Sequence, residues 1–281
     1  MMERTITPES IAQFEQHLVA EELADGTIQK YKRDLLAFSA WAGNTELTRE
    51  LAAGWKEQLV LRGYAPATIN SMLAVINHFF KFTGRCDCTV KFLKLQRRLF
   101  RDRSRELAEE EFRRLVDTAD RTGQKRLALL LETIAATGIR VSEVRYITVE
   151  AARLGRAEIA LKGKIRTILL PSRLCRKLLK YAGKNNTASG EIFRTGSGRG
   201  LNRKQIWAEM KRLCGVAGVA ASKVFPHNLR HLFATTFYRA TRDIAGLADV
   251  LGHSSVETTR IYLVTTGEEH LRQLDRLGFV R

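Results

Sequence analysis

The chain has 281 residues, of which 47 are lysine or arginine and 30 are aspartate or glutamate, so its formal net charge at pH 7 is +17. This surplus favours a polyanionic partner over acidic proteins or neutral small molecules. It favours a nucleic acid but does not specify DNA, because many ribosomal and membrane-surface proteins are equally basic. No apolar run approaches the roughly 20 residues that cross a bilayer, and no signal-peptide pattern opens the sequence, which predicts a cytoplasmic protein without a membrane partner.

The first ninety residues have the apolar spacing of helices. Apolar residues recur at three- and four-residue intervals in the segments 8–24, 26–42, 48–62 and 66–82, and glycine-containing breaks separate them. We therefore predict four helices packed together. In and near the last helix, large apolar residues are predicted to form a core and not a platform for stacking bases: Leu59, Ile69, Leu73, Ile76, Phe79 and Phe80.

A basic stretch separates this helical part from the rest of the chain. It is predicted to be an interdomain linker, either a solvated connector or a strap that neutralises DNA phosphates. The predicted domains are 1–92 and 107–281, with the linker at 93–106, and the next helix is predicted to begin at Ala108. The basic residues are Lys91, Lys94, Arg97, Arg98, Arg101, Arg103 and Arg105.

The second domain is predicted to open with helices. An apolar helix over 126–136 is stopped by Gly138. A further helix over 141–147 is predicted to place Arg140 and Glu143, which are three residues apart, on one face.

A hairpin follows these helices. Two short β-runs, 158–161 and 165–170, are joined by the turn Lys162-Gly163-Lys164. The hairpin is therefore predicted to expose lysines at its tip.

Two helix ends near the C-terminus gather polar residues. Pro226 suits a first helical turn, which places His227, Arg230 and His231 on one face where the helix N-terminus favours a phosphate.

Farther on, another helix is predicted to end at Gly252. Ser254 and Glu257 have the spacing of a capping box, which predicts that a new helix containing Tyr262 begins there. His253 then lies in the corner between two helices.

The order of these residues suggests a phosphodiester site. Tyr262 has a phenol oxygen that can attack phosphorus. His227, Arg230 and His253, which precede it, can hold the phosphate and neutralise the charge that grows during attack. Arg140 would add a second guanidinium group.

The motifs together are far more specific than any one residue. They are Thr-Gly-Ile-Arg-x-x-Glu at 137–143, His-x-x-Arg at 227–230, and Leu-Gly-His-Ser-Ser at 251–255, with Tyr262 nine residues beyond His253. Over nearly its whole length the chain resembles the tyrosine recombinases of the phage integrase family, and its size and layout are most similar to Xer-type enzymes. The resemblance implies a mainly α-helical protein with a small β-hairpin, in which a four-helix, SAM-like core-binding domain and an α+β catalytic domain form a C-shaped clamp around DNA.

The resemblance also implies catalytic roles. Tyr262 would be the nucleophile that forms a 3′-phosphotyrosyl bond and frees a 5′-hydroxyl. Arg140 and Arg230 would bind the phosphate, His253 would donate a hydrogen bond to it, and His227 would be a general base or hydrogen-bond partner of the phenol.

By the same resemblance, a hairpin lysine would protonate the leaving oxygen. Lys162 is the favoured candidate and Lys164 the alternative, because the turn is one residue shorter than the family's usual Lys-Gly-x-Lys. Glu143 would orient groups of the site, and His231 would support the helix rather than contact phosphate.

Neither a cofactor nor a metal is expected. The glycine-rich segment 195–200 is not followed by Lys-Ser/Thr, so it is interpreted as a surface loop and not as a nucleotide-binding loop. The cysteines have neither zinc-site nor disulfide spacing and are predicted to be reduced structural thiols: Cys86, Cys88, Cys175 and Cys214.

The implied partners are double-stranded DNA with paired core sites and either a homotetramer or a related recombinase. The tail, 266–281, either folds on its own core or docks into a neighbouring protomer. Site-specific recombination is favoured over a type IB topoisomerase-like nicking and closing activity and over a non-catalytic DNA-binding regulator. Chromosome-dimer resolution and mobile-element integration both remain open as the biological role.

Overall fold

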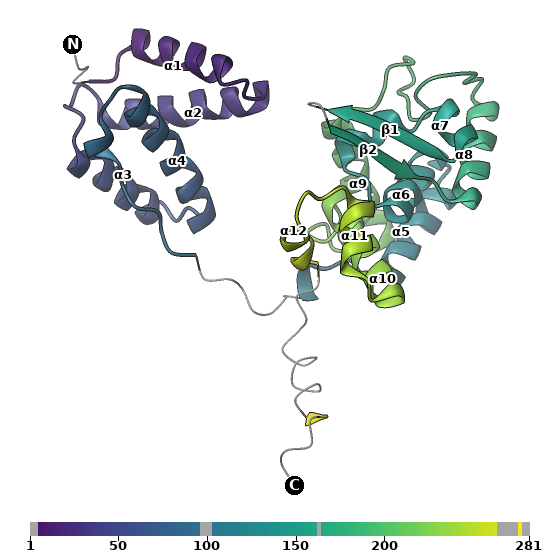
Figure 1. The fold of residues 1–281 in the computed structure, drawn as a ribbon. Coiled ribbons are helices and arrows are strands. Elements are labelled where there is room, and N and C mark those ends of the chain that lie inside the picture. Colours follow the sequence, from purple (N-terminus) through teal and green to yellow (C-terminus); the bar gives the residue numbers. More distant parts are fainter. Residues whose placement is uncertain (1–4, 96–102, 162–163, 263–274, 277–281) are drawn as a thin grey trace. The chain divides into compact units, whose positions relative to one another are not determined.

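The computed structural model describes residues 5–95, 103–161, 164–262 and 275–276 (Figure 1). The chain divides into two compact units, Met1–Arg97 and Arg98–Arg281, each with its own hydrophobic core. The described residues are mostly helical and include one antiparallel pair of strands, which confirms the predicted fold class. Among the described helices, none combines the length and apolar character needed to span a membrane. The predicted linker limits stay a prediction, because residues 96–102 lie outside the described residues.

The first unit contains the predicted helices. The side chains of Thr7 and Thr48 cap the first and third of them by accepting hydrogen bonds from backbone N–H groups. The predicted core residues of this unit are each no more than 1% exposed, which confirms that they form a core. The helices are α1 (Pro8–Ala20), α2 (Asp25–Ala42), α3 (Arg49–Leu61) and α4 (Pro66–Phe82), followed by the 3₁₀ turn η1 (Cys86–Cys88).

Helix α1 is shorter than predicted, since it ends at Ala20 and not near residue 24. Glu22 adopts a left-handed conformation with φ of 57°, and the N–H of Leu23 donates to the Leu18 carbonyl at 3.2 Å. This closure satisfies carbonyls at the end of the helix and reverses the chain. The sequence predicted a longer helix because apolar residues continue at helical spacing beyond this turn.

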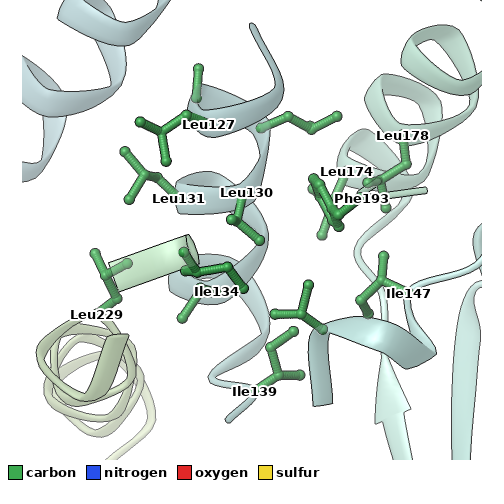
Figure 2. Packing of buried hydrophobic residues seen from close by; sticks show 14 of the residues in the cluster. Leu127, Leu130, Leu131, Ile134, Ile139, Ile147, Leu174, Leu178, Phe193 and Leu229 are labelled. Carbon is green, nitrogen blue, oxygen red and sulfur yellow. The ribbon is translucent and has the colours of Figure 1, made fainter. Parts of the chain in front are cut away.

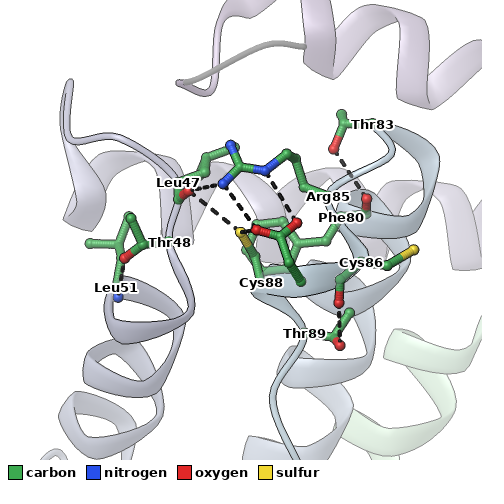
Figure 3. A network of polar contacts seen from close by, with 10 residues as sticks. Leu47, Thr48, Leu51, Phe80, Thr83, Arg85, Cys86, Cys88 and Thr89 are labelled. Atoms are coloured by element: carbon green, nitrogen blue, oxygen red, sulfur yellow. Dashed lines mark hydrogen bonds and ion pairs between the residues drawn. The ribbon is translucent and has the colours of Figure 1, made fainter.

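A polar network ties η1 to the segment before α3 (Figure 3). The guanidinium of Arg85 donates to the Leu47 carbonyl at 2.7 Å and also contacts the carboxylate of Asp87. The Cys88 thiol lies 3.4 Å from the same carbonyl. These contacts join the end of the first unit to its middle.

The second unit is built around α6, whose apolar side chains are covered from several sides (Figure 2). Its helices are α5 (Glu109–Arg121), α6 (Lys125–Thr137), α7 (Val149–Leu154), α8 (Ser172–Lys184), α9 (Arg203–Ala217), α10 (Pro226–Thr241), α11 (Ile244–Leu251) and α12 (Val256–Arg260), with 3₁₀ turns η2 (Arg103–Arg105) and η3 (Val141–Tyr146). The residues at the centre of this core include Leu130, Ile134, Ile139, Ile147, Leu174, Leu178, Phe193 and Leu229.

The hairpin consists of β1 (Arg156–Leu161) and β2 (Lys164–Leu169). The strands pair from Arg156 opposite Leu169 to Leu161 opposite Lys164. Lys164 therefore belongs to a strand and not to the turn, whereas Lys162 and Gly163 lie outside the described residues.

Two local predictions were wrong. The segment after Arg140 is a 3₁₀ helix and not an α-helix, and the Glu143 carboxylate accepts the Arg140 N–H at its start. The last helix is capped by Ser255 and not by Ser254, and it ends at Arg260, so Tyr262 lies in a turn beyond it.

Candidate active site

Arg230 is the buried centre of the site. Helix α10 begins at Pro226 and carries this arginine in its second turn, where it is 2% exposed. Its guanidinium donates to the Gly138 carbonyl at 2.5 Å and to the Leu251 carbonyl at 2.8 Å. Both acceptors lie at the C-terminal ends of helices, α6 and α11, where the helix dipole favours a cation. Burial lowers the pKa of Arg230, and the hydrogen bond with Tyr262 opposes that effect.

Position 138 requires a glycine, because of both its backbone conformation and its close neighbours. It adopts a left-handed conformation, with φ of 62°, and an added Cβ would lie 2.4 Å from the Phe233 ring. The same residue presents its carbonyl to Arg230. The end of α6 is therefore packed against α10 at the point where the arginine is held.

Replacing Gly138 with alanine is expected to destabilise the second unit more than the same change at Gly155. Both glycines have a positive φ, but no atom approaches the Cβ position at Gly155 within 4 Å. The clash with Phe233 should therefore add about 1–3 kcal/mol to the loss of unfolding free energy. Urea unfolding of the two variants measures this difference, and equal losses would show that the packing at Gly138 is not tight.

Arg140 shares a buried carboxylate with a second arginine. Its N–H donates to one oxygen of Glu143 at 2.7 Å, and its Nη1 donates to the other at 2.9 Å. Nη1 of Arg166 donates to that second oxygen at 2.5 Å. Burial acts to raise the pKa of Glu143, but the Arg140 N–H and the two guanidinium groups outweigh it and hold the pKa below its ordinary value. Glu143, at 4% exposure, is therefore an ionised carboxylate between two cations.

Arg166 was not singled out from the sequence. The signal that points to it is strand alternation, since Arg166 shares a face of β2 with Ile168, which is 2% exposed. A cation at a position that the alternation assigns to the interior needs a buried partner. Glu143 is that partner.

The protonation of His253 follows from its partners. A guanidinium can only donate, so the contact of 2.9 Å from Arg230 to Nε2 makes this nitrogen an acceptor. The proton then lies on Nδ1, which donates to the hydroxyl of buried Thr259 at 2.8 Å. Burial, followed by the charges of Arg230 and Arg140, lowers the pKa of His253 to about 4. The imidazole is therefore neutral at neutral pH.

Tyr262 is held among three histidines and is 3% exposed. Its ring is stacked on His253, with centroids 6.0 Å apart and an interplanar angle of 9°. The rings of His231 and His227 lie at 5.4 and 6.2 Å. Burial lowers the pKa of His227, with a further contribution from the nearby arginines.

One cavity collects most of the predicted residues. It has a volume of about 570 Å³. Its lining includes Arg140, His227, Arg230, His253 and Tyr262. His231 contacts the tyrosine ring. The arrangement offers a phenol, guanidinium groups and neutral imidazoles to a single anionic group.

The structure does not choose between the two lysines of the hairpin. Lys162 lies outside the described residues. The backbone of Lys164 is placed in β2, but its side chain is also outside what the structure describes.

Among the described residues, one group of side chains that could hold a metal ion lies in the first unit. The ligand atoms of His17, Glu21 and His78 are all within 4.8 Å of one another. Nε2 of each histidine lies 3.3 Å from a different carboxylate oxygen of Glu21. Such contacts are satisfied as hydrogen-bonded pairs without an ion. The four cysteines are free thiols, and only Cys86 of them is exposed.

Two family profiles match this chain. The profile of the phage integrase family matches residues 105–269. The chain belongs to the phage integrase family. The N-terminal SAM-like domain of phage integrases matches residues 11–85. The family inferred from the motif spacing is thereby confirmed.

Curated tyrosine recombinases align with the chain over most of their length. Tyrosine recombinase XerA of Thermococcus kodakarensis is 30% identical, over 94% of this chain and 93% of its own. XerA of Pyrococcus furiosus is 29% identical over 97% and 95%, and XerD of Brucella suis is 29% identical over 89% and 90%. These relatives support a tyrosine recombinase of the Xer type.

Solved structures of phage integrase family members share the fold. The XerH site-specific recombinase bound to its difH substrate matches with a TM-score of 0.69 at 19% identity, covering 95% of this chain and 84% of that one. A lambda integrase dimer bound to a COC′ core site matches with a TM-score of 0.74 at 16% identity, covering 92% and 77%.

Proposed function

We propose that this phage integrase family member is a site-specific DNA recombinase that breaks and rejoins strands through a covalent bond to Tyr262. The observation that carries the proposal is the single cavity in which the buried Tyr262 lies with Arg140, Arg230, His227 and His253. A phenol alone is a weak nucleophile, but cations around the phosphate lower the barrier to attack.

In the cleavage step, the Tyr262 oxygen attacks the phosphorus of the scissile phosphodiester. A bond forms between this oxygen and phosphorus, and the bond from phosphorus to the 5′ oxygen breaks. The product is a 3′-phosphotyrosyl link and a free 5′-hydroxyl. Because the phosphate ester is conserved, attack by a 5′-hydroxyl from another strand reverses the step and rejoins DNA without an external energy source.

The cations have separate tasks in this proposal. Arg230 is fixed by two helix ends and lies beside the tyrosine, so it neutralises charge close to the attacking oxygen. Arg140 is more exposed, with 44% of its side chain accessible, and is free to approach a nonbridging oxygen. Planar guanidinium groups suit the oxygens of a pentavalent phosphate.

Different side chains are proposed to transfer the two protons of the reaction. His227, whose lowered pKa keeps it neutral, accepts the phenol proton. His253 hydrogen-bonds the phosphate after it is released from Arg230, and His231 supports the tyrosine ring. We assign the proton of the leaving 5′ oxygen to Lys162, with Lys164 as the alternative, because a cationic amine at a hairpin tip can reach the DNA backbone.

The proposed partner is double-stranded DNA with paired core sites, enclosed by both domains and bound by four copies of the chain or by this chain with a related recombinase. The net charge of +17 supports a polyanionic ligand. The tail, 266–281, which is proposed to dock into a neighbouring protomer, lies almost entirely outside the described residues.

Nicked suicide duplexes from the protein's genomic neighbourhood test this function. The nick lets the 5′-hydroxyl fragment diffuse away, so a covalent adduct should accumulate, and peptide mapping should place it on Tyr262. An adduct on Tyr238 would contradict the assignment of the nucleophile. Relaxation of supercoiled plasmids that lack any defined site, without strand exchange between sites, would instead indicate a topoisomerase.

A further inference from the structure

Arg166 connects three parts of the catalytic unit. It lies on β2 with 13% of its side chain exposed. Its Nη1 donates to Glu143 in η3, and its Nη2 donates to the Val250 carbonyl in α11 at 3.1 Å. Its alkyl chain fills the space at Gly252, where an added Cβ would lie 2.3 Å from Cδ of the arginine. The side chain is therefore fixed at both its stem and its charged end.

The net charge of the group around Glu143 depends on the Arg166 side chain. Arg140 and Glu143 alone would form a neutral pair, and the carboxylate would compete with a DNA phosphate for the guanidinium. With Arg166 present, one negative charge is shared between two positive charges, and the group has a net charge of +1. Since Glu143 is nearly fully buried, solvent cannot supply this compensation.

Resting on the function proposed above, we propose that Arg166 is a positioning residue that holds Glu143 and thereby keeps the group of Arg140 and Glu143 net positive, with Arg140 correctly oriented toward the scissile phosphate. It does so from the strand that follows the hairpin tip, without contacting DNA itself. The same charge also acts on the corner that carries His253, since Arg166 contributes to lowering the pKa of that histidine.

The first test compares a charged and a neutral scissile link. Arg166→Met removes the charge and keeps much of the stem. At metal centres, partners that orient a directly acting group contribute about 10- to 100-fold, and a similar loss of cleavage rate is expected on a normal phosphodiester. On a methylphosphonate link, which lacks the charge that Arg140 neutralises, the loss should shrink to less than about threefold. Equal losses on both links would overturn the proposal.

The matched control is Arg156→Met on the neighbouring strand. It removes one positive charge from the same hairpin, but Arg156 pairs with exposed Glu158 and not with Glu143. No change of cleavage rate is expected for this variant on either link.

A second measurement does not depend on strand cleavage. Titration with inorganic phosphate, followed by ³¹P NMR, should show a Kd several-fold weaker for Arg166→Met than for the wild type and for Arg156→Met. An unchanged Kd would overturn the role of Arg166 whether or not the protein cleaves DNA. Failure of the wild type to form any adduct, with the phosphate result as expected, would instead overturn the proposed function.

Arg166→Lys keeps the test informative if the methionine variant does not fold. Lysine retains the positive charge but cannot span Glu143 and Val250 together. Its phosphate Kd should stay within about twofold of the wild type, while the cleavage rate falls because Arg140 is less well oriented. The variant Arg140→Met gives the effect of losing Arg140 itself on the phosphate Kd. If Arg166→Lys weakened phosphate binding as much as Arg140→Met does, this result would contradict the proposal.

Discussion

Replacing Tyr262 with phenylalanine is expected to abolish the covalent adduct with DNA completely. The substitution removes only the hydroxyl oxygen that forms the bond to phosphorus. The ring should remain stacked on His253 and packed among Ala234, Leu247 and Leu251, because these contacts involve carbon atoms. Denaturing electrophoresis of the nicked suicide substrate measures the adduct.

The control for this change is Tyr238→Phe, which removes the hydroxyl of a tyrosine on α10. This variant should form the adduct at the wild-type rate. Both variants should bind the duplex with wild-type affinity. Persistence of an adduct in Tyr262→Phe would require another nucleophile.

Replacing Arg230 with lysine is expected to slow cleavage by about 10²–10³-fold, the effect of losing one preorganised donor at a site of developing charge. A single ammonium cannot reach the Gly138 and Leu251 carbonyls and the tyrosine hydroxyl with the geometry of a guanidinium. Carbonyls left without a donor in the interior should also lower the unfolding free energy by about 1–3 kcal/mol. Single-turnover cleavage rates and urea unfolding measure the two effects.

Arg239→Lys is the matched control, because Arg239 is exposed in the last turn of the same helix. It should leave both the cleavage rate and the unfolding free energy unchanged. Comparable losses in the two variants would mean that the burial of Arg230 has no part in catalysis.

The sequence predicted the helices well where apolar spacing and glycine stops coincide. Helix α4 has the predicted limits, and α6 ends at Gly138 because a left-handed residue closes it. The predictions failed where short polar contacts compete with the helix. The segment after Arg140 forms a 3₁₀ helix whose first turn carries the contact between Glu143 and the Arg140 N–H, and α12 is capped by Ser255 and not by the adjacent Ser254.

Most of the residues that the motif spacing singled out line one cavity, but the spacing could not give their hydrogen bonds. The tautomer of His253 depends on Arg230 and Thr259, which approach it from two different elements. Arg166 belongs to none of the motifs, and its role depends on packing between β2, η3 and α11. Contacts between segments far apart in the chain are set by tertiary structure and not by local spacing.

The hydroxyl of Thr259 gives the site a way to change state with little motion. The hydroxyl accepts a hydrogen bond from Nδ1 of His253, while Nε2 accepts one from Arg230. If a phosphate takes the place of Arg230 as the partner of Nε2, this nitrogen needs a proton to donate to the phosphate, and Nδ1 must become an acceptor. A hydroxyl can reverse its role by rotating about its C–O bond. The imidazole can therefore exchange its partner Arg230 for a phosphate by moving one proton from Nδ1 to Nε2.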